Sequence, residues 1–270
     1  MGREVSPVSC GLCGGENSKG YLKSGGYSLV RCSGCGLVYT ENFSESAISY
    51  SEDRYFTQRN QYVQRWDEFC AIFSVLFDKI CRFKDGGTLL DVGAGVGCLA
   101  SIAQARGFTV SGVEVSEWAA RFARDEKGLN IITGKLEDAG FEKESFDVIV
   151  INHVLEHVEQ PRAMLCNVRE LLKPEGMLVI GVPNAASLMA KLKRGRWASL
   201  LPEQHRWHFS PATLRKMAEL CGLREIYFEA RENYPVSGWG PQSLFRRSIN
   251  RLSVMTDRSE AMLLFCAKVS

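Results

Sequence analysis

Four cysteines near the start of the chain are spaced as metal ligands. Cys10 and Cys13 form one CxxC pair, Cys32 and Cys35 form a second, and 18 residues separate the pairs. Each CxxCG turn directs two thiolates at one point, and four thiolates complete a closed tetrahedral shell with no open position for catalysis. The pattern predicts a structural zinc ribbon over residues 1–41, whose folding free energy comes from the metal. The alternative is two redox pairs, but a redox motif should adjoin a βαβ unit, which this part of the sequence lacks.

A second stretch suited to chemistry is LLDVGAGVGCLA, residues 89–100. A short apolar run ends in Asp91, three glycines follow, and a helix-like segment begins. Glycines let a ligand approach the backbone, and the first N–H groups of a helix can bind it. The dinucleotide fingerprint requires glycine or alanine where Cys98 stands, and Asp91 would repel a pyrophosphate. A ligand with an ammonium and a sulfonium group suits Asp91, so the turn favours S-adenosylmethionine. The glycines are Gly93, Gly95 and Gly97.

Glu114 ends the next strand-like run, in GVEVS. A carboxylate about 20 residues after a glycine turn can accept hydrogen bonds from both ribose hydroxyls of a nucleotide. This position suits NAD and S-adenosylmethionine equally, so Glu114 predicts an adenosine ligand without choosing between them. The alternative is a solvated residue at a strand end.

A repeated strand–helix pattern from residue 88 would position these groups. The strand-like runs are apolar throughout, as buried parallel strands are, and helical patterns lie between them. Such alternation predicts an α/β fold, a doubly wound, mostly parallel sheet covered on both faces. The strand-like runs cover 88–92, 108–115, 129–133, 146–152 and 176–182, and the helical ones 97–106, 116–127 and 161–172.

The pattern changes after Pro183. A basic piece, KLKRGRW, is followed by EQHRWHFSP, then by a helix from Pro211 to Gly222 and by two final strands. The long connection at 231–258 between those strands is typical of a lid, a binding element or a disordered loop. The basic piece is either a solvated face or a contact for phosphate.

From these motifs, residues 88–230 resemble the class I S-adenosylmethionine-dependent methyltransferases. LLDVGAGVG is similar to their first motif, GVEVS to their second-strand end, FDVIVINHVLEHV to their fourth-strand motif and LLKPEGMLVIGVPN to their fifth. The resemblance implies a Rossmann-like sheet of seven strands with the last one antiparallel. The N-terminal CxxCG ribbon adds a likeness to bacterial methyltransferases of polysaccharide and secondary-metabolite pathways.

The resemblance also implies roles at matching positions. Asp91 and the glycine turn would border the methionine part of S-adenosylmethionine. Glu114 would hold the ribose, with Val115 beside the adenine. Leu136 and Glu137 would flank the edge of the adenine, and Asn152 and His153 would lie beneath the sulfonium. One position before Leu136, where the family commonly has Asp, this chain has Lys135.

All four histidines lie in two segments. His153 and His157 follow the fourth strand, and His205 and His208 lie in EQHRWHFSP. If the acceptor is a hydroxyl, a histidine is the usual general base, so His205, His208 and His153 are the catalytic candidates. The alternative is that His205 and His208 anchor their loop. We interpret His157 mainly as structural or close to the cofactor.

Composition limits the class of protein. The chain has 270 residues, ten cysteines, 45% hydrophobic residues and a net charge of +2, so no global field attracts nucleic acid or anionic lipid. No apolar run is long enough for a membrane span, and no secretory signal is apparent. Unpaired cysteines in such a chain predict a reducing, cytoplasmic location. The oligomeric state is not specified by the sequence.

We therefore expect three parts: the ribbon at 1–41, a helical connecting segment at 42–86 and a methyltransferase domain at 87–270. The expected function is methylation, at oxygen or carbon, of a small-molecule acceptor such as a sugar, nucleotide-sugar or secondary metabolite. The alternative is an RNA methyltransferase that uses the ribbon to grip RNA. The low net charge argues against nucleic acid as a partner without excluding it.

Overall fold

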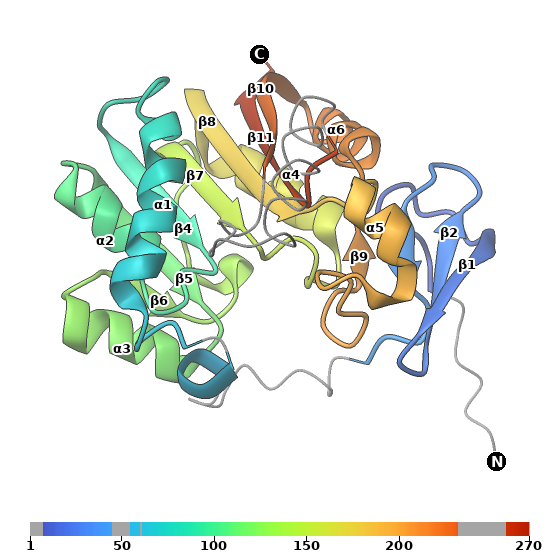
Figure 1. Cartoon of the computed structure of the whole chain (residues 1–270). Helices are drawn as coiled ribbons and strands as arrows, with labels where there is room; N and C mark the ends of the chain where they lie inside the picture. Colours follow the sequence, from blue (N-terminus) through green and yellow to red (C-terminus); the bar gives the residue numbers. More distant parts are fainter. Residues whose placement is uncertain (1–7, 45–54, 60, 232–257, 270) are drawn as a thin grey trace.

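The computed structural model describes residues 8–44, 55–59, 61–231 and 258–269. Two sheets organise these residues, a seven-stranded one in the centre and a four-stranded one beside it (Figure 1). The long connection at 231–258, expected to be a lid, a binding element or a disordered loop, lies outside the described residues over 232–257.

The central sheet has the strand order β10-β11-β8-β7-β4-β5-β6. Its strands from β4 to β8 pair in parallel, whereas β11 is antiparallel to both β8 and β10. The predicted doubly wound, mostly parallel sheet with an antiparallel late strand is confirmed. The strands are β4 (Thr88–Val92), β5 (Thr109–Glu114), β6 (Ile131–Thr133), β7 (Phe146–Asn152), β8 (Leu172–Pro183), β10 (Leu223–Arg231) and β11 (Ala261–Lys268).

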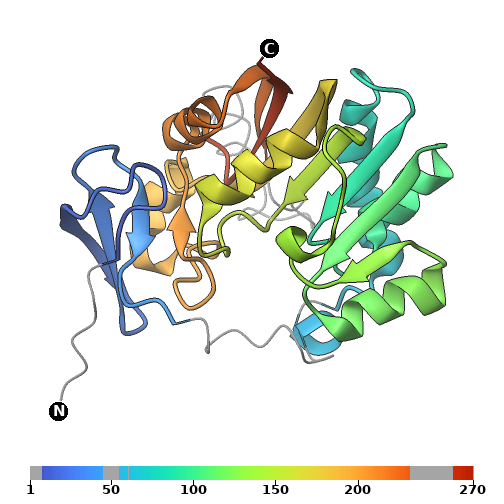
Figure 2. The ribbon, with the colours of Figure 1, turned by 180° about the vertical axis from the view of Figure 1, so that it is seen from behind.

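Helices cover both faces of this sheet. Three of them pack in one apolar core with alternate residues of the strands, and two pack in the core on the other face (Figures 1 and 2). Local signals fix their ends: the Ser116 hydroxyl accepts the Ala119 N–H at the start of one helix, and Ser210 forms a capping box with Thr213 at the start of another. The first group is α1 (Trp66–Ile80), α2 (Cys98–Ala105) and α3 (Glu117–Lys127), and the second is α4 (Pro161–Leu171) and α6 (Pro211–Leu220).

Residues 8–44, here called the N-terminal module, form the other sheet together with a strand from far along the chain. This sheet has the order β1-β2-β3-β9. Its strands are β1 (Ser18–Ser24), β2 (Tyr27–Cys32), β3 (Val38–Thr40) and β9 (Trp207–His208). Seen from behind, the module packs beside the segment that contains β9 (Figure 2). Trp207 extends this contact, because a Cβ added at Gly11 would lie 2.7 Å from its ring.

Two segments form elements that the sequence pattern did not predict. Strand β1 pairs with β2 through a two-residue loop, Gly25-Gly26, with positive φ at both positions. Such a loop matches the right-handed twist of the two strands that it joins. The basic piece after Pro183 forms a short helix, α5 (Leu188–Lys193), and a 3-10 turn, Arg194–Arg196. Other short turns are Tyr55–Arg59 and Leu136–Asp138.

Candidate functional site

The carboxyl ends of β4 and β7 meet where the strand order of the central sheet reverses. The chain runs from β4 outward through β5 and β6, and then returns to β7 on the other side of β4. A crevice at such a point is where ligands bind in open α/β sheets. Gly93, directly after β4, has φ of 74°, and a Cβ there would lie 2.2 Å from Cγ2 of Val154. With this backbone conformation, only glycine therefore fits at position 93.

Gly97 and Gly95 complete the turn. Gly97 has φ of 90° and precedes the first residue of α2, and a Cβ there would lie 2.3 Å from Cδ1 of Leu129. Gly95 also has positive φ, of 56°, but its added Cβ would meet only Phe56, at an ordinary distance of 3.5 Å. The expected glycine-rich turn between β4 and α2 is thus present, and close neighbours explain Gly93 and Gly97, whereas positive φ explains Gly95.

Asp91 is an acid without a full set of partners. Its side chain is 4% exposed, and Oδ2 is buried with no hydrogen-bond partner among the described residues. Burial, with the neighbouring charge of Glu114 as a second cause, raises the pKa of Asp91 to about 7. A cationic group beside Oδ2 would satisfy this oxygen and favour its charged form.

Glu114 ends β5 and contacts the glycine turn directly. Its Oε2 accepts the Gly95 N–H at 2.7 Å, and its Oε1 accepts the Ser116 N–H at 2.8 Å. Burial raises the pKa of this carboxyl, which is 6% exposed. The two bonds fix the carboxylate at the edge of the turn, where each oxygen keeps a second lone pair for a ligand hydroxyl.

The expected adenine-side residues lie along the same edge with different exposure. Val115 is 54% exposed, Leu136 is buried in the turn after β6, and Glu137 is exposed beside it. Phe56 and Trp118 stack with ring centroids 5.9 Å apart and pack in one cluster with Val96 and Cys98, next to the glycine turn. The sequence did not predict that Trp118 stacks on Phe56 beside the glycine turn, because no local pattern relates these two residues.

Asn152 and His153 stand at the end of β7. Oδ1 of Asn152 is buried without a hydrogen-bond partner among the described residues and faces Gly181, where a Cβ would lie 2.2 Å away. His153 has φ of 57°, a strained backbone for a residue with a side chain, and its ring is 35% exposed. Its Nδ1 lies 3.0 Å from Oε1 of Glu156, which is 1% exposed.

Glu156 is a buried acid that the sequence reasoning did not select. Burial is the largest single cause and would raise its pKa, but the hydrogen bond with His153 and the charges of the neighbouring histidines together bring the pKa to about 2. The carboxylate is therefore ionised and accepts the proton on Nδ1 of His153, which leaves Nε2 as the basic nitrogen of that ring. The available signal was the spacing in His153-Val-Leu-Glu156, where an acid three residues on can return to the ring.

The other candidate histidines are buried. His205 is 6% exposed and His208 is 5% exposed. Nε2 of His208 lies 3.1 Å from Oγ1 of Thr40, in the N-terminal module, and burial lowers its pKa to about 4. Burial, together with the charge of His157, holds the pKa of His205 well below its usual range. Both rings are neutral at pH 7.

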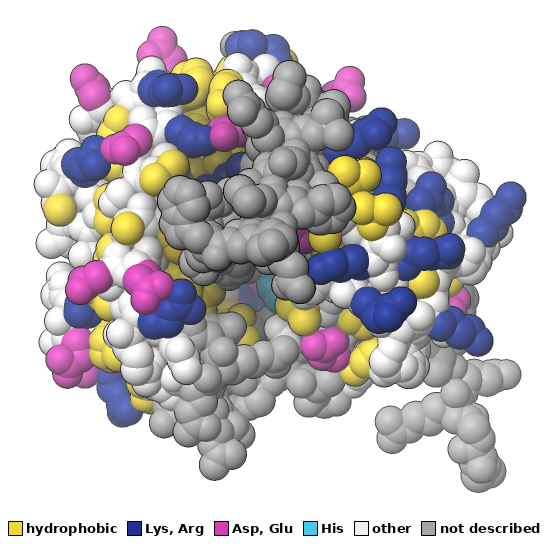
Figure 3. All heavy atoms as spheres, in the orientation of Figure 1, with side chains coloured by type: hydrophobic (Ala, Val, Ile, Leu, Met, Phe, Trp, Pro, Cys, Tyr) yellow, Lys and Arg dark blue, Asp and Glu magenta, His cyan; other side chains and the backbone are white. Residues whose placement is uncertain are grey.

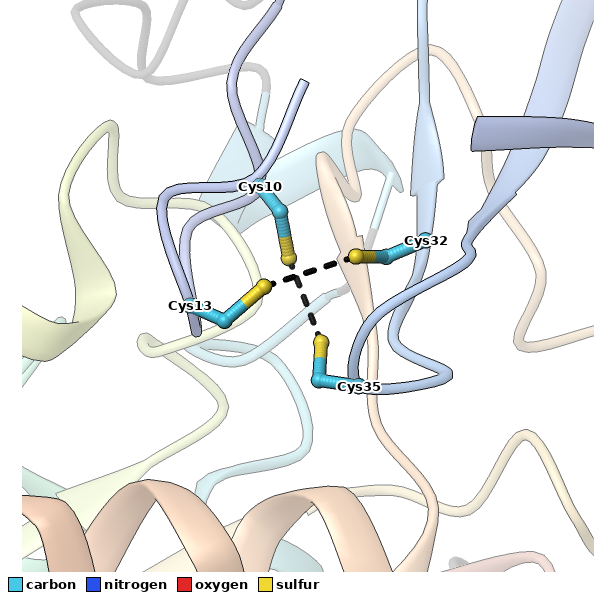
Figure 4. A group of neighbouring side chains, drawn as sticks. All are labelled: Cys10, Cys13, Cys32 and Cys35. Carbon is cyan, nitrogen blue, oxygen red and sulfur yellow. Dashed lines mark hydrogen bonds between the residues drawn. The ribbon is translucent and has the colours of Figure 1, made fainter. Parts of the chain in front are cut away.

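The four cysteines of the N-terminal module converge on one point (Figure 4). The Sγ atoms of Cys10 and Cys35 are 3.4 Å apart, and those of Cys13 and Cys32 are 3.5 Å apart. These distances are too long for disulfides and close to the roughly 3.8 Å edge of a tetrahedron with metal–sulfur bonds of about 2.3 Å. The pairs connect the two CxxC turns, so one ion would tie both turns together.

The basic piece presents its charges to solvent. Lys191, Lys193, Arg194 and Arg196 are all exposed, and Figure 3 shows Lys and Arg side chains gathered on this side of the molecule, over α5 and the N-terminal module. Two of them, Lys191 and Arg194, also line a cavity of about 200 Å³ with Trp197. This exposure is compatible both with a solvated face and with a contact for phosphate.

The fold and the glycine-turn site define the Rossmann-like class of methyltransferase domains. A family described as "Methyltransferase domain" matches residues 59–227, more than half of the chain, and the chain belongs to this family. It carries a methyltransferase domain with the seven-stranded sheet of that class.

Curated relatives match only part of the chain. An uncharacterized protein of Methanocaldococcus jannaschii is 31% identical over 49% of this chain and 62% of its own length. The mitochondrial ubiquinone biosynthesis O-methyltransferase of Schizosaccharomyces pombe is 35% identical over 40% of this chain and 41% of its own length. A demethylmenaquinone methyltransferase of Tropheryma whipplei is 31% identical over 45% and 55%. The chain thus spans less than two thirds of each of these relatives.

Solved structures agree on the fold. A SAM-dependent methyltransferase from Archaeoglobus fulgidus has a TM-score of 0.56 at 20% identity, over 73% of this chain and 93% of its own. The PH0226 protein of Pyrococcus horikoshii has a TM-score of 0.57 at 19% identity, over 84% and 100%. Among the residues that the structure describes, no helix combines the length and apolar character needed to cross a bilayer.

The described residues fit S-adenosylmethionine, the cofactor of this class. The buried, unpartnered Oδ2 of Asp91 suits its cationic methionine part. Gly93 and Gly95 have no side chains of their own, so a ligand can approach their backbone closely, and Glu114 offers acceptor oxygens at the end of β5. These groups come from β4, β5 and the turn between β4 and α2, so the sheet alone positions them.

Proposed function

We propose that the protein transfers the methyl group of S-adenosylmethionine to an oxygen or carbon atom of a small-molecule acceptor. S-adenosylmethionine supplies an activated methyl group, so the protein needs mainly to align the acceptor and to manage a proton. The observation that carries the proposal is the His153–Glu156 pair, which stands at the end of β7 next to the glycine turn.

On the cofactor side, Asp91 and Glu114 do different work. Asp91 faces the cationic methionine part with a buried carboxylate oxygen. Glu114 accepts hydrogen bonds from the ribose hydroxyls and keeps the turn closed through Gly95. Val115 and Leu136 provide apolar surface for the adenine, and Glu137 lies beside them.

On the acceptor side, His153 is the group that contacts the reacting atom. Of the three candidate bases it is the one with a partly exposed ring, because His205 and His208 are almost completely buried. Nε2 of His153 accepts the proton of an acceptor hydroxyl, while Glu156 orients the ring through the contact at Nδ1. Asn152, one residue earlier, lies beneath the sulfonium. The name of the Schizosaccharomyces pombe relative, a ubiquinone biosynthesis O-methyltransferase, supports oxygen as the atom methylated.

The test separates binding from chemistry. With a radiolabelled methyl donor, a panel of hydroxylated acceptors including nucleotide-sugars, phenols and sugars would be screened for methyl transfer. His153→Ala is expected to lower kcat about 100- to 10,000-fold, the usual range for a general base, and to leave the dissociation constant of S-adenosylmethionine within about threefold. Full activity of His153→Ala on an accepted substrate would refute the assignment of the base.

We also propose that the four cysteines hold a structural zinc ion. The support is the cysteine spacing and the convergence of the four Sγ atoms. Such a site holds the N-terminal module in the form that pairs with β9. It has no open position, so its role is to stabilise the module rather than to react.

A small-molecule acceptor is favoured over RNA. Net charge is only +2, and the relatives named above offer no support for RNA methylation. The likeness to polysaccharide and secondary-metabolite methyltransferases keeps sugars and nucleotide-sugars first in the panel of acceptors. We propose a reducing, cytoplasmic setting, in which the thiolates stay available for metal.

A further inference from the structure

Three potential metal ligands converge where the loop after β7 meets the loop before β9. Glu156 and His157 lie in the first loop and His205 in the second, and one ligand atom from each lies within 4.8 Å of the others. The backbone holds the loops together, because the N–H groups of Arg206 and Trp207 both donate to the carbonyl oxygen of Glu156, at 2.9 and 3.1 Å. This group is separate from the four cysteines and from the glycine turn.

Both histidine rings are fixed by a bond to a backbone carbonyl. Nδ1 of His157 lies 2.9 Å from the oxygen of Gln204, and Nδ1 of His205 lies 3.1 Å from the oxygen of Ser199. A carbonyl can only accept, so each Nδ1 carries the proton and each Nε2 carries the lone pair that a metal ion takes. Metal-binding histidines typically have such a carbonyl partner, because it fixes both the tautomer and the orientation of the ring.

Glu156 provides an independent sign that a ligand belongs here. The side chain is 1% exposed, and only one of its two oxygens is used, by His153. The other, Oε2, is buried and has no hydrogen-bond partner in the part of the chain that the structure describes. A buried carboxylate oxygen without a partner is costly, and a cation at this point would remove that cost.

We propose that Glu156, His157 and His205 bind a divalent first-row transition metal ion, of which Zn²⁺ is the type. Two imidazoles and one carboxylate suit Zn²⁺ and its neighbours better than Mg²⁺ or Ca²⁺, which prefer all-oxygen shells. Bonds of about 2.1 Å place tetrahedral ligands about 3.4 Å apart, so the three groups close by at most about 1.4 Å on binding. Three protein ligands leave a fourth position open, unlike the closed shell of four cysteines.

The open position gives this ion a role in the reaction proposed above, on which this step rests. Glu156 would join the ion to His153, because its Oε1 lies 3.0 Å from Nδ1 of that ring, and the acceptor oxygen would give its proton to Nε2 of His153 as proposed above. The new bond joins that oxygen to the methyl carbon, the bond from this carbon to sulfur breaks, and the neutral thioether leaves with the electron pair. A bound ion would supply positive charge beside the His153–Glu156 pair, which would favour the loss of that proton.

Cobalt titration of the full chain tests the metal site without any acceptor. Protein stripped by a chelator is titrated with Co²⁺, because cysteine ligands give an intense sulfur-to-cobalt absorption that a nitrogen and oxygen site lacks. We expect two ions per chain, one with and one without the sulfur band. Zn²⁺ should displace both, and millimolar Mg²⁺ should displace neither. Wild-type protein that takes up no sulfur-free cobalt would overturn the proposal.

Matched variants locate the second ion. His205→Gln and Glu156→Gln should bind the sulfur-free cobalt at least 100-fold more weakly, since losing even an outer partner of a ligand costs 10- to 100-fold. His208→Gln alters a neighbouring buried histidine outside the ligand set and should retain both ions. Equal affinity in His205→Gln, with folding checked by circular dichroism, would also overturn the proposal. If the protein binds two cobalt ions per chain but transfers no methyl group, only the proposed function is refuted. If it transfers methyl groups but binds only the cysteine-bound ion, only the second metal site is refuted.

Discussion

Replacing Asp91 with Asn should stabilise the cofactor-free protein as pH rises and at the same time weaken its binding of S-adenosylmethionine. Asp91 is 4% exposed, with an unpartnered Oδ2, and its pKa is raised to about 7 from an ordinary value of 3.8. The carboxylate is therefore costly in the empty protein and useful once a cation lies beside it. Asn has nearly the same shape but no charge at any pH.

The sign and size of the stability effect come from the two pKa values. Below pH 4 the acid is protonated in both states and costs nothing. Between about pH 4 and pH 7 the unfolded chain ionises and the folded one does not, which favours unfolding. Above pH 7 the penalty is complete, at up to about 4 kcal/mol for a raise of about three units at 1.36 kcal/mol each. The new amide offsets part of this at every pH, by about 1–3 kcal/mol, because its N–H donors are buried.

Urea denaturation from pH 5 to pH 8, followed by tryptophan fluorescence, measures this effect. The stability of Asp91→Asn minus that of the wild type should rise by about 2–3 kcal/mol over that interval. Calorimetry should show that the wild type binds S-adenosylmethionine more tightly as pH rises towards 7. The variant should bind it about 10- to 150-fold more weakly at pH 8, with a flatter pH profile. A stability difference that stays constant with pH would refute the reasoning.

Two further substitutions test other parts of the structure. Gly93→Ala places a methyl group 2.2 Å from Val154 at positive φ and should lower the free energy of unfolding by more than about 2 kcal/mol. The control, Gly25→Ala, also has positive φ but meets open space, so it should lower that free energy by only about 1 kcal/mol. Equal losses in the two variants would contradict the close approach at the turn. Cys13→Ser should remove one zinc ion per chain in elemental analysis and lower the melting temperature by several degrees, and unchanged zinc content would argue against a four-thiolate site.

Much of the central sheet could be predicted from the sequence because its signals are local. Apolar runs such as FDVIVIN become strands buried on both faces, and β7 has the predicted bounds. The glycine turn was also recognisable, since its residue types are dictated by backbone angles that only glycine adopts freely. Asp91 and Glu114 followed from their positions at strand ends, which parallel topology brings to one edge.

The missed features depend on contacts between distant segments. Strand β9 has only two residues, and its reason to be extended is β3 in the N-terminal module, with which it pairs through Val38 and Tyr39. His208 is a candidate base or loop anchor in the sequence, but the residue it contacts in the structure, Thr40, is 168 residues away. Glu156 meets His205 only because the loop before β9 is held against it. No local pattern contains this information.

Calorimetric titration of S-adenosylmethionine into the wild type and Glu114→Ala tests the central claim most directly. The wild type should bind one molecule per chain, and the variant should bind about 10- to 150-fold more weakly, because hydrogen bonds to a charged group worth about 1.5–3 kcal/mol are lost. Glu117→Ala, an exposed acid three residues on in the first turn of α3, is the matched control and should bind as the wild type does. Equal affinity in the wild type and Glu114→Ala, or no binding to either, would contradict the assignment of this edge of the sheet as the cofactor site.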